Sequence, residues 1–118
     1  MNRRVFGNAG EDAACAYLQK KGWEIIGRNV HCGRNEIDII ARKRRLLAFV
    51  EVKRRSSLRY GRPAEAVDAE KQRRIVQAAA LYIQENGLEN ANIRFDVIEV
   101  LPGEIRHIEA AFDASDLF

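Results

Sequence analysis

The spacing of apolar residues along the chain predicts two helices. Apolar residues three and four positions apart indicate a helix over residues 9–21, which Asn8 can cap and Gly22 can end. A second stripe of the same kind indicates a helix that begins at Asp68, its N-cap candidate, and runs to about Glu85. Each helix has one apolar face, so we expect each to pack against a sheet.

Runs of β-branched and aromatic residues predict five extended segments. A polar link, residues 31–35, precedes a hairpin whose basic turn spans residues 42–45. If that turn has about four residues, Asp38 lies opposite Glu51 across the hairpin. This order of helices and strands predicts an α/β fold with a central mixed sheet and helices on its faces. The expected segments are residues 23–26, 36–41, 46–54, 93–100 and 105–109.

Length and composition indicate an ordinary globular protein. With 118 residues, 47% hydrophobic and 31% charged, we expect one domain over residues 1–118. No apolar run approaches the roughly 20 residues that span a bilayer, so no membrane association is expected. The first residues lack a secretory pattern, and Cys15 and Cys32 are therefore expected to be reduced thiols in a cytoplasmic protein.

The charge is distributed unevenly along the chain. Residues 42–74 contain twelve Lys or Arg against four Asp or Glu, a net charge of +8, whereas the remainder has eight against thirteen, a net charge of −5. Such a cluster attracts polyanions such as nucleic acid. A solvated hairpin tip and helix face would have the same composition, and the sequence leaves both interpretations open.

Three charged residues stand within the most apolar part of the chain. Asp38 lies among isoleucines, and Glu51 and Lys53 follow a run of apolar residues. Burying an unpaired charge in such surroundings is energetically costly. Residues 51 and 53 of a strand point to the same face. Two carboxylates beside an ammonium could hold a divalent cation and a phosphate together. Periodicity alone also allows an ordinary cross-strand ion pair on a surface hairpin.

These residues carry a family resemblance. Asp38 with Glu51-Val52-Lys53 resembles the PD-(D/E)xK motif of restriction endonucleases and archaeal Holliday junction resolvases, and residues 5–112 resemble the YraN family of small bacterial proteins. The resemblance implies a restriction-endonuclease-like three-layer α/β fold, with a central mixed β-sheet flanked by helices and the site on the central hairpin. Arg34-Asn35 departs from the family pattern, in which a glycine often stands immediately before the acid at the position of Glu36. The matching stretches are Gly7-x-x-Gly10-Glu11-x-x-Ala14, Tyr17-Leu18, Gly22, Asn29, Glu36-Ile37-Asp38-Ile39-Ile40-Ala41, Phe49-Val50-Glu51-Val52-Lys53-x-Arg55, Lys71 and Arg94-Phe95-Asp96-Val97.

The same resemblance implies a role for each site residue. Asp38, Glu51 and the backbone carbonyl of Val52 would be ligands for Mg²⁺ or Mn²⁺, and Lys53 would be the catalytic amine. Glu11 matches an additional acid that resolvases place near the metal. The spacing of Asn8 and Glu11 also fits a capping box, and both roles can coexist.

The function that follows from the resemblance is metal-dependent hydrolysis of nucleic acid phosphodiesters. DNA of branched or structured form is the expected substrate, and a homodimer would match the two-fold symmetry of a four-way junction. The alternative is a catalytically inactive nucleic-acid-binding or DNA-processing accessory protein on the same fold. Asp96 is expected to be a solvated or salt-bridged acid. The candidate nucleic-acid-binding residues are Arg54, Arg55, Arg59, Arg62, Lys71 and Arg74.

Overall fold

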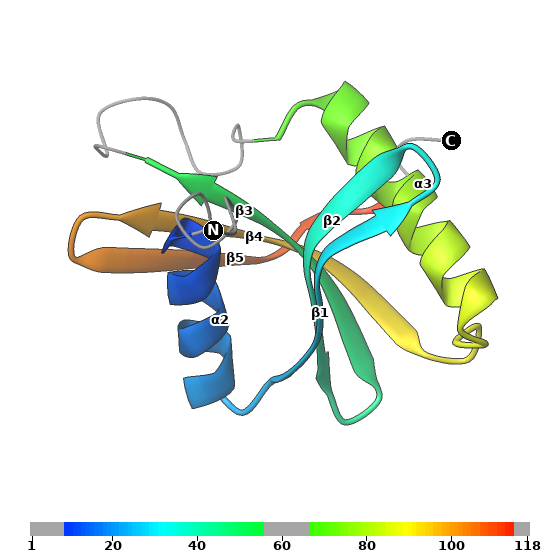
Figure 1. Cartoon of the computed structure of the whole chain (residues 1–118), viewed down its shortest axis with the longest axis horizontal. Coiled ribbons are helices and arrows are strands. Elements are labelled where there is room, and N and C mark those ends of the chain that lie inside the picture. Colours follow the sequence, from blue (N-terminus) through cyan, green and yellow to red (C-terminus); the bar gives the residue numbers. More distant parts are fainter. Residues whose placement is uncertain (1–8, 56–66, 115–118) are drawn as a thin grey trace, which may run out of the picture.

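A twisted five-stranded sheet lies between two helices, with its strands in the spatial order β1-β2-β3-β4-β5 (Figure 1). The computed structural model describes residues 9–55 and 67–114. Strands β3 and β4 run parallel and the other neighbours are antiparallel, so the sheet is mixed, as predicted. The elements are α2 (Ala9–Lys20), β1 (Glu24–Cys32), β2 (Asn35–Lys43), β3 (Leu46–Arg54), α3 (Ala69–Glu85), β4 (Asn92–Leu101) and β5 (Glu104–Phe112).

The helices cover opposite faces of the sheet. Helix α2 packs Ala14 and Leu18 against Ile39, Val50 and Ile98. Helix α3 covers the other face and also connects β3 to β4, because two parallel strands need a crossover connection. Neither helix of the described residues has the length and apolar composition to cross a bilayer. The predicted α/β class with helices on both faces is therefore confirmed, and it is compatible with a three-layer restriction-endonuclease-like fold.

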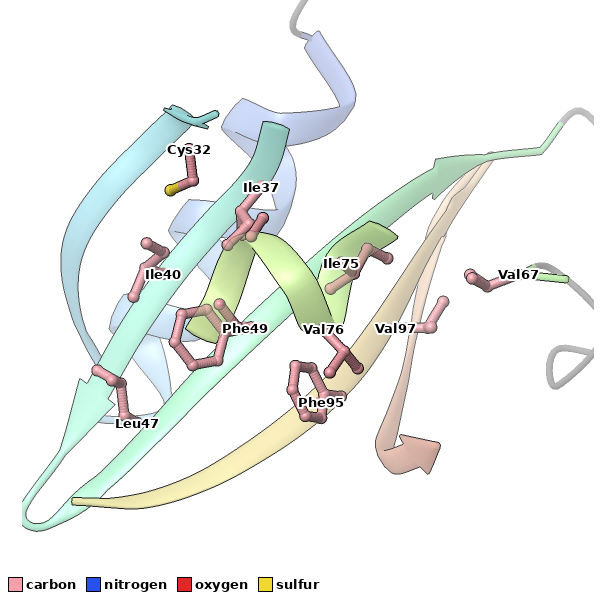
Figure 2. Packing of buried hydrophobic residues seen from close by; sticks show 12 residues of the cluster. Cys32, Ile37, Ile40, Leu47, Phe49, Val67, Ile75, Val76, Phe95 and Val97 are labelled. Carbon is pink, nitrogen blue, oxygen red and sulfur yellow. The ribbon is translucent and has the colours of Figure 1, made fainter. Parts of the chain in front are cut away.

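Aromatic side chains form the centre of the layer beneath α3. The rings of Phe49 and Phe95 stack with centroids 5.7 Å apart, and both are buried. Ile75 and Val76 of the helix pack in the same cluster (Figure 2). Aromatic pairs contribute about 0.5–1.5 kcal/mol beyond their buried area. This core anchors the part of β3 that leads directly into Glu51.

The α3 helix has the predicted bounds and the predicted cap. The carboxylate of Asp68 accepts a hydrogen bond from the backbone N–H of Lys71 at 2.8 Å. We expect Asp68→Ala to lower the free energy of unfolding by about 1 kcal/mol, because one N–H of the first turn loses its partner. Urea denaturation at neutral pH measures the change. An unchanged transition midpoint would show that water replaces the cap at no cost.

Two of the strand predictions are wrong in extent. The first strand does not end at residue 26 but continues to Cys32, so the predicted polar link is a tight turn at residues 33–34, with Gly33 at φ +64°. Because β1 is an edge strand, it tolerates polar residues that hide its pattern. The last strand likewise extends to Phe112, beyond the predicted residue 109.

The hairpin of β2 and β3 has the predicted register with a shorter turn. Lys43 pairs with Leu46 and Ile39 with Val50, so the turn consists of residues 44–45 only. Arg44 lies at φ +58°, the left-handed conformation that two-residue hairpin turns require. The shorter turn leaves the sum of paired residue numbers unchanged, and Asp38 therefore remains level with Glu51.

Candidate active site

The site begins where β2 and β3 stop pairing. Their ladder ends at Ile39 and Val50, one position before Asp38 and Glu51. The backbone N–H of Val52, which would otherwise bond to β2, donates instead to the Asp38 carboxylate at 2.9 Å. Asp38 thereby satisfies a backbone donor and lies at the opening between the two strands.

A twist in β2 places Asp38 between the two layers of the molecule. Ile37 and Ile39 would share one face of a regular strand. Instead, Ile37 packs in the cluster under α3, and Ile39 packs in the cluster under α2. The side chain between them can consequently interact with groups from both helices.

Glu51 is a buried carboxylate that receives charged neighbours from three elements. Its side chain is 6% exposed, and its Oε2 atom lies 3.7 Å from Nζ of Lys53 and 3.6 Å from Nζ of Lys71. Burial raises the pKa of Glu51 to about 7, as do the negative charge of Asp38 and the hydrogen bond that a protonated Glu51 donates to it. The two lysines act in the opposite direction. Near neutral pH this carboxyl is therefore poised between its two charge states.

Glu11 reaches the same region from α2. Its carboxylate accepts a hydrogen bond from the side-chain amide of Asn29 at 2.9 Å and lies 3.9 Å from the Arg28 guanidinium. Burial and the nearby charge of Asp38 raise the pKa of Glu11. The alternative capping box involves Asn8, which lies outside the described residues. Glu11, Asp38 and Glu51 thus form a chain of interacting acids.

The donor set fits a cation of the magnesium type. Asp38 and Glu51 are like charges in hydrogen-bonding reach, an arrangement that a divalent cation would relieve. The N–H and C=O of one strand residue point to the same side, so the Val52 carbonyl faces the Asp38 side as well. Within residues 9–55 and 67–114, no group of three or more His, Cys, Asp or Glu could hold a metal ion. Mg²⁺ needs only one or two carboxylates, since waters and substrate phosphates complete its shell.

The predicted nucleic-acid-binding residues separate into different locations. Arg55 lies on the same face as Lys53, where it pairs with Glu99, whereas the side chain of Arg54 lies on the opposite face beside Gly10. Arg74 pairs with Glu70 on the exposed side of α3. Lys71, expected to contact the phosphate backbone, points to Glu51. Arg59 and Arg62 lie outside the described residues.

A second buried acid lies on the other face of β4. Asp96 is fully buried, so the expectation of a solvated acid is wrong and that of a salt bridge is confirmed. Burial acts to raise its pKa, but hydrogen bonds from His107, Arg94 and the Ala110 N–H outweigh burial and lower it. Nε2 of His107 lies 2.7 Å from the carboxylate. The network joins β4 to β5 on the α2 side of the sheet and is separate from the candidate site.

Sequence reasoning missed Glu99, whose buried carboxylate lies beside Lys53. The two residues are paired across β3 and β4, and Glu99 also contacts Arg55 and Arg106. A glutamate at an alternate position of a buried strand was the available signal. The structure therefore extends the charged face of the site from β3 to β5.

Fold and site together define a class: α/β proteins with a mixed sheet and a carboxylate and lysine cluster at the open end of a central hairpin. Within that class the chain belongs to UPF0102, described as an uncharacterised protein family, whose model matches residues 10–100. This is the family that the YraN resemblance indicated. The chain is 50% identical to a UPF0102 protein of Symbiobacterium thermophilum, over 97% of this chain and 100% of that protein. It is 43% identical to one of Chloroherpeton thalassium, over 100% of this chain and 92% of that protein.

Proposed function

We propose that the protein is a Mg²⁺- or Mn²⁺-dependent nucleic acid phosphodiester hydrolase. The observation that carries the proposal is the position of Glu51, a buried carboxylate that interacts with Asp38, Lys53 and Lys71. Burial and the charge of Asp38 disfavour the ionised form of Glu51 in spite of the two ammonium groups, and a cation bound by both acids would relieve this. A structural ion pair needs neither the second acid nor the second lysine.

The residues would divide the catalytic work among them. The chemistry that a bound Mg²⁺ supplies is stabilisation of negative charge on phosphate oxygens and acidification of water. Asp38, Glu51 and the Val52 carbonyl would hold the ion. Lys53 would donate to the attacking water or to a phosphate oxygen as charge develops there. Glu11, held by Asn29, would orient a water on the α2 side of Asp38.

The expected substrate is DNA of branched or structured form. The basic segment, residues 42–74, includes both lysines of the site and supplies the field that attracts a polyanion. The preference for branches comes from the resemblance to junction resolvases and is an analogy at the level of the fold. A homodimer on a four-way junction would present two such sites related by two-fold symmetry.

Cleavage assays test the proposal. Purified protein is incubated with single-stranded, duplex, flap and four-way junction DNA in Mg²⁺ or Mn²⁺, beside an Asp38→Ala variant prepared identically. We expect cleavage of at least one substrate by the wild type and none by the variant. Equal cleavage in both preparations would identify a contaminating nuclease and remove the support for the proposal.

Cation binding should also be visible as thermal stabilisation. At tenfold excess over its dissociation constant, a ligand that binds only the folded state stabilises it by about 1.4 kcal/mol. We expect Mg²⁺ and Mn²⁺ to raise the melting temperature of the wild type at pH 8 in differential scanning fluorimetry. Asp38→Ala should abolish the rise. A rise of equal size in the variant would place the cation elsewhere.

The second candidate function is nucleic acid binding without cleavage. It is favoured by the lack of a three-residue metal cluster in the described parts of the chain. A pure binding protein would hold DNA in EDTA with undiminished affinity and would cut none of the substrates. The same cleavage and binding assays therefore distinguish the two functions.

A further inference from the structure

Glu99 is a buried acid between two arginines that come from different segments of the chain. Its side chain is 6% exposed. Nε of Arg55, just beyond β3, lies 3.2 Å from Oε2, and Nη1 of Arg106, in β5, lies 3.9 Å from Oε1. Each carboxylate oxygen thus has one guanidinium. Removing this acid would take from each arginine the carboxylate that it contacts here.

The arginines keep donors available for a ligand. Their side chains are 30% and 40% exposed, whereas the acid between them is covered. Among the described residues, Arg55 contacts Glu99 through Nε, and its terminal nitrogens have the geometry of the fork that matches a phosphate. With Glu99 the pair carries a net charge of +1, and Lys53 on the adjacent strand adds another positive charge.

Glu99 and its arginines adjoin the candidate active site, and Arg55 also lines a surface groove. Backbone pairing places Glu99 beside Lys53 and Arg106 beside Glu99, so the three residues form one row across the sheet. Arg55 is hydrogen-bonded through its N–H to the Val100 carbonyl, which fixes the backbone at this end of β3. A groove of about 640 Å³ opens there, lined by Arg54, Arg55, Val100, Leu101 and Pro102. Its volume is within the range of ligand-binding clefts.

We infer that Arg55 and Arg106, positioned by Glu99, bind a backbone phosphate next to the one that is cleaved. The inference rests on the proposed function for the identity of the ligand, a nucleic acid strand. The row of Lys53, Glu99 and Arg106, which begins two residues along β3 from Glu51, sets the direction in which the nucleic acid strand leaves the site. Glu99 is a positioning residue, and the two arginines make the contact.

The test measures DNA binding as a function of salt, in EDTA so that no cleavage occurs. Each phosphate contact contributes about 0.7 to the slope of log affinity against log salt for single strands and about 0.9 for duplexes. We expect Arg106→Gln to reduce the slope by that amount and the affinity by about five- to eightfold at 0.1 M salt. Lys20→Gln, at an exposed position in the last turn of α2 and outside the basic segment, removes the same charge and should leave the slope unchanged.

Glu99→Gln separates positioning from a general effect of charge. The substitution makes the protein more positive by one charge, so a general field would tighten binding. If Glu99 orients the arginines, binding weakens instead, and the melting temperature of the variant verifies that it is folded. If Glu99→Gln fails to fold, the salt dependence of DNA binding by Arg106→Gln still decides whether the phosphate site exists.

The outcomes distinguish this inference from the proposed function. If the wild type binds and cleaves DNA while Arg106→Gln keeps the wild-type slope, the phosphate site is wrong and hydrolysis stands. If the slope falls but the wild type cleaves nothing with Mg²⁺ or Mn²⁺, the phosphate site stands and hydrolysis is wrong. A wild type that binds no DNA overturns the phosphate site.

Discussion

Replacing Lys53 with methionine is expected to lower the rate of DNA cleavage by about 10²–10⁴-fold, the usual contribution of a positioned proton donor or charge-stabilising group. The Nζ atom lies 3.7 Å from Glu51, and the side chain is 34% exposed. Methionine keeps most of the apolar stem, so the fold should be retained. Single-turnover cleavage at saturating Mg²⁺ measures the loss. An unchanged rate would exclude Lys53 from the reaction.

Lys71→Met is the matched control, because its Nζ lies 3.6 Å from the same Glu51 oxygen and its side chain is 39% exposed. Lys71 comes from the first turn of α3, whereas Lys53 shares a strand with Glu51. We expect Lys71→Met to raise the DNA concentration needed for half-maximal rate more than it lowers the maximal rate. Equal losses of maximal rate in both variants would mean that the lysines only neutralise Glu51.

Local signals were sufficient for the central elements of the fold. The β3 strand follows its apolar run from Leu46 to Arg54, and α3 begins after the Asp68 cap and ends at Glu85, both as predicted. The hairpin register followed from the position of the predicted turn at residues 42–45, because shortening the turn equally from both sides does not alter which residues are paired. These predictions needed only periodicity and capping.

Features created by contacts between distant segments were not predictable. The separation of β2 from β3 depends on an Asp38 side chain replacing a backbone partner, which no periodic pattern encodes. The approach of Lys71 to Glu51 depends on how α3 crosses the sheet. Asp96 alternates with apolar residues along its strand, a pattern typical of an acid that faces solvent. In the fold it is buried and paired with His107, 11 residues away in the sequence, and with Arg94, two residues away. Tertiary packing decides each of these cases.

The buried carboxyl of Glu51 should make the free energy of unfolding depend on pH. Its pKa is about 7 in the folded protein and near 4.5 when unfolded. Between these values the folded state binds the extra proton, so the stabilisation is complete below pH 4.5 and is lost as the pH rises through 7. A difference of this size corresponds to about 3 kcal/mol. Urea denaturation in EDTA at pH 5 and pH 8 measures the loss.

Glu51→Gln is expected to remove this loss, because an amide cannot ionise and still donates a hydrogen bond to Asp38. Glu104→Gln, which changes the same charge at an exposed position in β5, should keep the wild-type pH dependence. If the proposed function holds, Mg²⁺ at pH 8 should restore the stability of the wild type and leave Glu51→Gln nearly unaffected, since a bound cation would take the place of the proton between the two acids. If Glu51→Gln retains the full pH dependence, the loss of stability between pH 5 and pH 8 does not come from the Glu51 carboxyl.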